Sequence, residues 1–254
     1  MRCSPLILFL LCAAGATCAT SPAPQLVRPL DGAGQLVLVT VADWQADTGI
    51  LRRFERIDGR WSAVAEPYAV TVGRNGTAWG LGLQQPQIDG PQKHEGDGKA
   101  PAGVFAIGIA FGSPPAIDSG LRYRAMDASD WCIDISGSPY YNRIISTGDV
   151  GEDAVKGSTE PMRRDIHLDG DPLYRKGFII GHNSGNSPGR GSCIFAHLWR
   201  GPGVPTAGCT AMPEPDMDAL LAWLDADKHP LFVLLPEPEY RRLLESWQLP
   251  ELNP

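Results

Sequence analysis

The stretch GFIIGHNSGNSPGRGSCIFAHLWRGPGVPTAGCTAM, residues 177–212, contains two short apolar runs separated by loops rich in glycine and proline. Short apolar runs that are bounded by turn-forming residues predict buried β-strands. Each run carries a histidine, His182 in FIIGHN and His197 in CIFAHLW, and the loop after the second run leads to Cys209. We therefore expect two neighbouring strands that bring a thiol and two imidazoles close together.

The first third of the chain also favours strands. Residues 35–44 are rich in β-branched residues, and residues 49–64 alternate around Asp58-Gly59, a pair typical of a hairpin turn. Residues 68–80 repeat the pattern around a second Asn-Gly turn. This region is predicted to be a β-meander.

Helices are expected only near the end of the chain. Residues 214–227 combine an acidic start with apolar residues at helical spacing, and residues 238–249 form a second helical pattern. The apolar run at residues 230–236 predicts a closing strand between the two helices. The predicted fold class is therefore mainly β with a few helices.

The first 19 residues predict an export signal. Arg2 precedes a short apolar run at residues 5–16, and Ala14-Gly15-Ala16 offers a cleavage site. The run is too short to span a bilayer comfortably, so the mature protein is expected without a membrane span, in the periplasm or cell envelope. An anchor that is never cleaved, cleavage at the weaker site Thr17-Cys18-Ala19 and lipid attachment at Cys18 stay open as alternatives.

The charge of the chain argues against one class of partner. The sequence holds 22 Lys and Arg against 29 Asp and Glu, which gives a formal net charge of −7. Binding to nucleic acid needs a concentrated basic face. We therefore expect no nucleic-acid partner, and the sequence does not indicate an oligomeric state.

The cysteines leave one thiol over. Six are present, of which Cys3 and Cys12 would leave with the signal, and Cys18 would leave too if cleavage follows Ala19. Cys132, Cys193 and Cys209 follow the predicted linker. Three is an odd number, so at most one internal pair forms. A leftover thiol in an oxidising space is exposed to oxidation unless it is buried or has a purpose.

Cys209 has the surroundings of a thiol nucleophile. A histidine can take its proton, a nearby helix start favours the thiolate, and Gly208 allows close approach of a substrate to backbone N–H groups. Two alternatives stay open from spacing alone. Two His and one or two Cys could hold zinc, although no paired ligand spacing is present, and Cys209 could instead pair with Cys193 or Cys132.

The segment IFAHLWRGPGVPTAGCTAM resembles the catalytic motif of the YkuD-type L,D-transpeptidases. In that motif a histidine is followed by [S/T]-x-G-C, and Thr206, Gly208 and Cys209 occupy those positions. Four more blocks resemble one branch of the family in the same order: GDGKAPAGVFAIGIAFG, WCIDISGSPYYNRII, FIIGHN and GSCIF. The blocks span most of residues 35–236.

This resemblance implies a β-sandwich-like catalytic domain at residues 35–236. The Pro/Gly-rich residues 20–34 predict a linker before it, and residues 237–254 are expected to form a helical tail. Its chemistry is an attack by Cys209 on the L-centred third residue of a peptidoglycan stem peptide. D-alanine leaves, and an amine from another stem resolves the thioester. His197 would be the base and then the acid, and His182 would orient the thiol or the substrate.

The same resemblance implies that Thr206, Gly208 and Thr210 bind substrate or its oxyanion, with no metal or cofactor. Two positions depart from the family pattern, because Ala207 replaces a histidine and Ala211 replaces a basic residue. Another arginine would then have to recognise a substrate carboxylate. The candidates from the sequence are Arg163, Arg164, Arg190 and Arg200.

Two other functions stay open. The same site with water as the acceptor would be a carboxypeptidase or hydrolase that trims stem peptides, and a protein whose Cys209 is disulfide-bonded would be a non-catalytic wall-binding module. Because Cys132 and Cys193 both lie away from the Gly-Cys loop, we predict that they form a disulfide and leave Cys209 free. The alternative is that both are buried free thiols.

Overall fold

The computed structural model describes residues 28–252. The predicted signal and most of the predicted linker lie outside the described residues. Within residues 28–34, Leu30 and Ala33 are buried in the main core. No helix in the described part of the chain is long and apolar enough to cross a bilayer.

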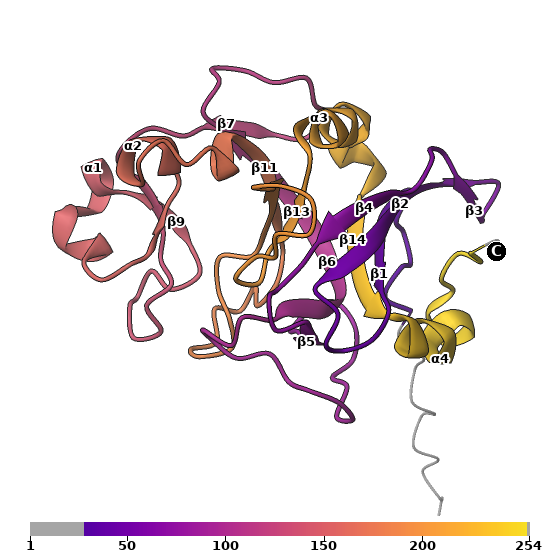
Figure 1. Ribbon diagram of the computed structural model, residues 1–254. Coiled ribbons are helices and arrows are strands. Elements are labelled where there is room, and N and C mark those ends of the chain that lie inside the picture. Colours follow the sequence, from indigo (N-terminus) through magenta and orange to yellow (C-terminus); the bar gives the residue numbers. More distant parts are fainter. Residues whose placement is uncertain (1–27, 253–254) are drawn as a thin grey trace, which may run out of the picture.

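Strands make up most of the elements, which confirms the mainly β expectation (Figure 1). The expectation of helices only near the end of the chain is wrong, because four short helices lie between β9 and β11. The strands are β1 Gln35–Val41, β2 Thr48–Ile57, β3 Arg60–Ala63, β4 Tyr68–Thr71, β5 Thr77–Trp79, β6 Ala100–Gly112, β7 Tyr123–Ala125, β8 Asp130–Cys132, β9 Ile144–Ser146, β10 Glu160–Pro161, β11 Lys176–Ile180, β12 Phe195–Leu198, β13 Thr210–Met212 and β14 Leu231–Pro236. The α-helices are α1 Thr147–Val150, α2 Arg164–His167, α3 Glu214–Trp223 and α4 Glu237–Trp247, and the short 3-10 helices are η1 Glu152–Val155, η2 Leu173–Arg175 and η3 Ala226–Lys228.

Eight strands form one closed, barrel-like sheet. Their order is β1-β14-β6-β11-β12-β13-β4-β2, and β2 pairs with β1 to close the ring. The expected sandwich of two separate sheets is not confirmed, because hydrogen-bonded neighbours continue around the whole ring. β1 is buried along its entire length, and its apolar side chains belong to the main core with those of β14.

The local turn predictions have different outcomes. At Asp58 and Gly59 both residues have positive φ, and the two-residue loop joins β2 to β3 as an antiparallel hairpin. Gly76 also turns the chain, but β4 and β5 do not pair with each other: β4 pairs with β2 and β13, and β5 pairs with β6. The predicted meander is therefore wrong beyond β3, because β4 pairs with β2 instead of β3.

Both predicted C-terminal helices are present and pack on the closed sheet. α3 contacts β11 and β12, and α4 contacts β14 and β1. Tyr240, Leu243 and Trp247 of α4 are buried in the main core, and the Trp247 ring lies 6.4 Å from the ring of Trp79. The predicted tail is thus an integral layer of the fold.

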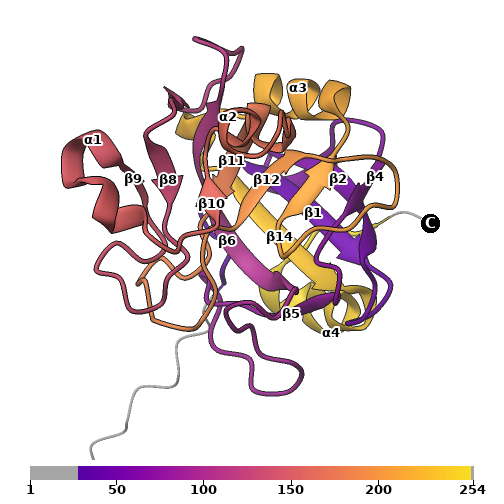
Figure 2. The same ribbon diagram turned by 60° about the vertical axis from the view of Figure 1, so that its left-hand side comes forward.

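A side lobe, residues 130–167, extends from the closed sheet, as the left side of Figure 1 shows. It contains the three-stranded sheet β10-β8-β9 together with α1 and α2. Glu160 of β10 accepts a hydrogen bond from the hydroxyl of Tyr174, which lies just before β11, so the lobe contacts the closed sheet at this point (Figure 2). The lobe therefore brings residues far apart in the sequence to the strands that carry the candidate site.

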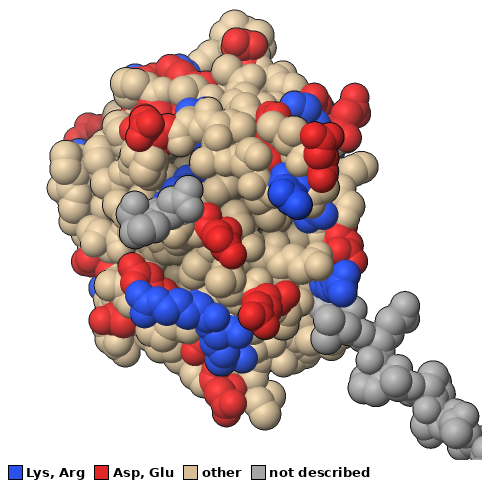
Figure 3. Space-filling view, turned by 90° about the vertical axis from the view of Figure 1, so that its right-hand side faces the viewer, with Lys and Arg blue, Asp and Glu red and all other residues tan. Residues whose placement is uncertain are grey.

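Charged side chains of both signs are interspersed on the face shown in Figure 3. Such mixing is typical of an ordinary solvated surface rather than of a single-sign field that attracts a polyelectrolyte.

Candidate active site

Strand pairing places Cys209 and His197 on one face of the closed sheet. β12 and β13 pair in parallel, with His197 opposite Ala211 and Ala196 opposite Thr210. Side chains alternate between the two faces of a strand, so Cys209, one residue before Thr210, shares the face of His197. As expected, the FIIGHN and CIFAHLW segments also form neighbouring strands, because β11 pairs with β12.

The thiol of Cys209 is free and buried, with 7% of the residue exposed. Its Sγ accepts a hydrogen bond from the Phe195 N–H at 3.3 Å and donates to the Cys193 carbonyl at 3.6 Å. Burial raises the pKa of this thiol to about 12, and the nearby Glu160 carboxylate adds to the rise. Cys209 is therefore a protonated thiol in this arrangement.

The imidazole of His197 is held as a neutral base. Its Nδ1 lies 2.7 Å from the Leu198 carbonyl, which can only accept, so Nδ1 carries the hydrogen and Nε2 keeps its lone pair. Nε2 has no hydrogen-bond partner among residues 28–252. Burial lowers the pKa of His197 to about 4, and the charges of Arg164 and Arg200 lower it further.

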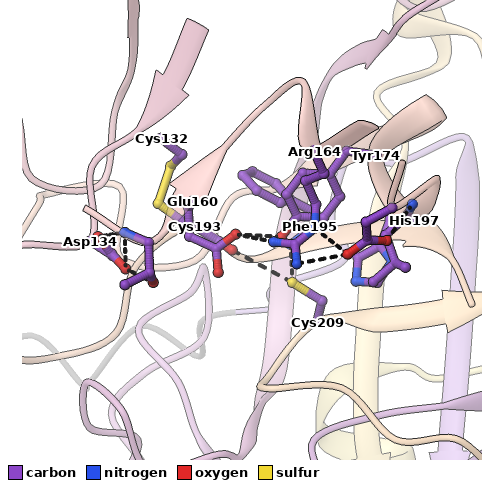
Figure 4. A network of polar contacts seen from close by, with 12 residues as sticks. Cys132, Asp134, Glu160, Arg164, Tyr174, Cys193, Phe195, His197 and Cys209 are labelled. Atoms are coloured by element: carbon purple, nitrogen blue, oxygen red, sulfur yellow. Dashed lines mark hydrogen bonds and ion pairs between the residues drawn. A yellow bond between two sulfur atoms is a disulfide. The ribbon is translucent and has the colours of Figure 1, made fainter. Parts of the chain in front are cut away.

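A disulfide joins the side lobe to the strand that leads into the site. Cys132 of β8 bonds to Cys193, as predicted, with their Cα atoms 6.0 Å apart. Asn142 of the lobe reinforces this junction, because its side chain accepts from the Cys193 N–H and donates to the carbonyls of His182 and Asn183. In the view of Figure 4, Cys209 lies between the disulfide and His197.

Two cavities meet at Cys209. The first, here called the arginine cavity, has a volume of about 240 Å³ and is lined by Arg74, Arg164, Arg200, Tyr174, His197 and Cys209, among others. The second, here called the acidic cavity, has a volume of about 140 Å³ and is lined by Glu95, Asp134, Glu160, Lys93, Gly208 and Cys209, among others. Arg74, Glu160, Ala207 and Cys209 line both. The thiol is therefore flanked by two spaces of unlike charge.

A buried polar network forms one wall of the arginine cavity. The Tyr174 hydroxyl donates to Glu160 at 2.7 Å, and the Tyr174 ring meets the His197 ring edge-on with 5.2 Å between centroids. Arg164 lies over the Tyr174 ring and pairs with Asp171 at 2.9 Å. Burial raises the pKa of Glu160, although Tyr174 and Arg164 oppose the rise. The network packs the imidazole against a fixed aromatic face.

The loop before Cys209 is shaped by Thr206 and Gly208. The Thr206 hydroxyl donates to the Cys209 carbonyl at 2.7 Å and accepts from the Gly208 N–H at 3.0 Å. A Cβ at position 208 would lie 2.9 Å from the Lys99 carbonyl oxygen, so only glycine fits. Thr206 lines the arginine cavity and Gly208 lines the acidic cavity.

The structure does not place His182 in the site, contrary to expectation. Its Nδ1 accepts from the Leu81 N–H at 3.2 Å, and its Nε2 lies 2.9 Å from the Arg190 carbonyl. His182 lines neither cavity beside Cys209. With both nitrogens bonded to backbone, this histidine fixes the loop after β11 instead of orienting the thiol.

Two further expectations about the site are wrong. Thr210 is buried and lines neither cavity, because alternation along β13 turns it to the opposite face from Cys209. The predicted helix start does not reach the thiol either, since β13 intervenes and α3 begins only at Glu214. Any stabilisation of a thiolate must come from other groups.

The arginines proposed from the sequence differ in their positions. Arg164 and Arg200 line the arginine cavity, but both pair with Asp171. Arg163 pairs with Asp165 outside the two cavities, and Arg190 lines neither of them.

Three residues of the site were missed by sequence reasoning: Arg74, Glu160 and Tyr174. They come from the β4–β5 turn, the side lobe and η2, none of which adjoins the motif in sequence. Of the three, only Tyr174 had a signal in the sequence: it lies two residues before β11, whose strand was predicted.

The described residues contain no group of three or more His, Cys, Asp or Glu side chains arranged to hold a metal ion.

The fold and site together define a mainly β protein with a closed sheet and a free thiol beside a neutral imidazole. No protein-family model and no curated protein matches the sequence. Among solved structures, the chain is similar to the helical cell shape determining protein Pgp2 from Campylobacter jejuni, with 19% identity and a TM-score of 0.33. The match covers 80% of this chain and 48% of the Pgp2 chain, so the chain spans about half the length of that protein.

Proposed function

We propose that the protein is an exported, cysteine-dependent acyltransferase of the YkuD type, which acts on peptidoglycan stem peptides in the periplasm or cell envelope. The observation that carries the proposal is the free thiol of Cys209 on the same sheet face and in the same cavity as the unpartnered Nε2 side of His197. The motif resemblance supplies the substrate class, and the site geometry supplies the roles.

The first step begins from a neutral thiol and a neutral imidazole. The Cys209 Sγ attacks the carbonyl carbon of the L-centred third residue while His197 Nε2 takes the thiol proton. The tetrahedral intermediate then breaks its C–N bond, and His197 gives the proton to the leaving amine of D-alanine. A thioester on Cys209 remains.

The second step resolves the thioester and regenerates the free thiol of Cys209. An amine of another stem peptide attacks the thioester, His197 takes a proton from that amine, and Cys209 leaves as a thiol with a cross-link formed. Water in place of the amine would give a shortened stem peptide. The inert wall-binding alternative requires a bonded Cys209, whereas in the structure Cys132 and Cys193 are bonded to each other.

The proposal is tested by the release of D-alanine from a stem tetrapeptide. We expect Cys209→Ser and His197→Ala each to lower the rate by a factor on the order of 100 or more, because one removes the nucleophile and the other its base. His94→Ala is the matched control, since His94 is exposed and lines neither cavity. Full activity in Cys209→Ser would contradict the proposal. The mass of the second product, cross-linked or shortened, identifies the acceptor.

A further inference from the structure

Arg74 stands out among the charged residues at the two cavities. It is exposed, it lines both the arginine and the acidic cavity, and its side chain has no ion pair or hydrogen bond with any other described residue. The neighbouring cations each have an acidic partner: Arg164 and Arg200 share Asp171, and Lys93 pairs with Asp97 at 2.5 Å. The charge of Arg74 is therefore available to a ligand.

The backbone of Arg74 is fixed to the loop that carries the thiol. The Arg74 N–H donates to the Thr206 carbonyl at 2.8 Å, and the Thr206 N–H donates to the Val72 carbonyl at 2.8 Å. Gly73 between them is tightly packed, since a Cβ there would lie 2.5 Å from the Gly98 carbonyl oxygen and the Ala100 nitrogen. Arg74 thus has a set position relative to the Thr206–Cys209 loop, although it lies far from that loop in sequence.

We propose that Arg74 binds the free carboxylate of the residue that leaves when Cys209 is acylated. A guanidinium presents a planar fork of N–H donors that matches a carboxylate. The site would then select peptides whose attacked bond is followed by a single residue with a free carboxyl group. This inference rests on the proposed function, and it assigns carboxylate recognition to a residue outside the Cys–His motif, where position 211 holds alanine.

The test compares two stem tetrapeptides, one ending in D-alanine and one ending in D-alanine carboxamide. Both give the same acyl group on Cys209, so intact-protein mass measures both acylation rates with one signal. We expect the wild type to prefer the acid, and Arg74→Ala to reduce that preference by about 10- to 100-fold, the range for a charge-assisted hydrogen bond. The rate with the carboxamide should stay unchanged, and Arg74→Lys should keep part of the preference. Arg200→Ala is the matched control, because Arg200 lines the same cavity but is paired.

Four outcomes would overturn the inference: no acid preference in the wild type, an acid preference that survives in Arg74→Ala, an equal slowing of both peptides in that variant, or a loss confined to Arg200→Ala. Failure of the proposed function has a different signature, since neither peptide would then acylate Cys209 in any variant.

Discussion

At the scale of single residues, burial sets the protonation states of the reacting pair. The pKa of Cys209 is raised to about 12 and that of His197 is lowered to about 4, in both cases chiefly by burial. An ion pair of thiolate and imidazolium would need the opposite order of pKa values. The resting site is therefore neutral, and in the proposed mechanism the thiol proton moves to His197 only as Cys209 attacks the substrate.

This protonation state predicts the pH dependence of Cys209 alkylation by iodoacetamide in the free protein. His197 stays uncharged above its pKa of about 4, and the thiolate fraction grows only as the pH approaches about 12. The rate should be low at neutral pH and rise about tenfold per pH unit up to the limit of protein stability. Cys209→Ser supplies the background. A rate that reaches a plateau at mildly acidic pH would show a preformed ion pair instead.

The residues that could be predicted are those that share one local segment. His197 lies in β12, and Thr206, Gly208 and Cys209 lie in the loop that joins β12 to its neighbour β13, so their spacing in the sequence specified their proximity. His182 was mispredicted because strand pairing alone does not say which backbone groups a side chain bonds. Arg74 could not be predicted, because its place beside the thiol depends on a pairing between segments more than a hundred residues apart.

At the scale of elements, the side lobe covers the thiol and is tied to the closed sheet. The lobe supplies Asp134, Glu160 and Arg164 to the cavities, and the Cys132–Cys193 disulfide joins it to the residues before β12. Tyr141 of the lobe also donates to Glu95 on the main body. The closed position of the lobe thus contributes to the burial that raises the pKa of Cys209.

Removal of the Cys132–Cys193 disulfide should lower the stability of the fold and loosen the side lobe over Cys209. For cysteines 61 residues apart, the loss of the cross-link is expected to lower the free energy of unfolding by about 4 kcal/mol in the chain-entropy account. Urea denaturation of Cys132→Ala/Cys193→Ala measures that loss. Alkylation of Cys209 in the folded variant should be faster than in the wild type. Unchanged stability together with unchanged alkylation would show that the lobe is held by its other contacts alone.

Element types were more predictable than their arrangement. The helical spacing near the C-terminus identified α3 and α4, and alternating patterns identified most strands, because both depend on local periodicity. The closure of the sheet through β1 and β2 depends on long-range pairing, so a sandwich and a closed ring have the same local pattern. The same limit explains why the meander predicted for the first third of the chain does not continue through β4 and β5.

At the scale of the whole molecule, two buried histidines couple stability to pH. The pKa values of His182 and His197 are both lowered to about 4, chiefly by burial, whereas the ordinary value is 6.5. Between pH 6.5 and about 4, these two histidines therefore bind protons in the unfolded chain but stay neutral in the native state. This contribution to stability is complete above pH 6.5 and is lost as the pH falls through about 4.

The expected loss is on the order of 3 kcal/mol for each histidine over that interval. Urea denaturation at several pH values between 7 and 4 should show it as a falling free energy of unfolding. His182→Gln should flatten this slope, because it removes one of the two histidines that resist protonation in the native state. Equal stability of the wild type at both ends of the interval would contradict the assignment of two buried neutral histidines.

The central claim, that Cys209 is an acyl-accepting nucleophile, is tested most directly by the mass of the intact protein after incubation with a stem tetrapeptide. The account predicts a mass increase equal to the tetrapeptide less D-alanine, which peptide mapping locates on the segment that contains Cys209. The increase should be absent from Cys209→Ser and strongly reduced in His197→Ala. An adduct that persists in Cys209→Ser, or maps to another residue, would contradict the account.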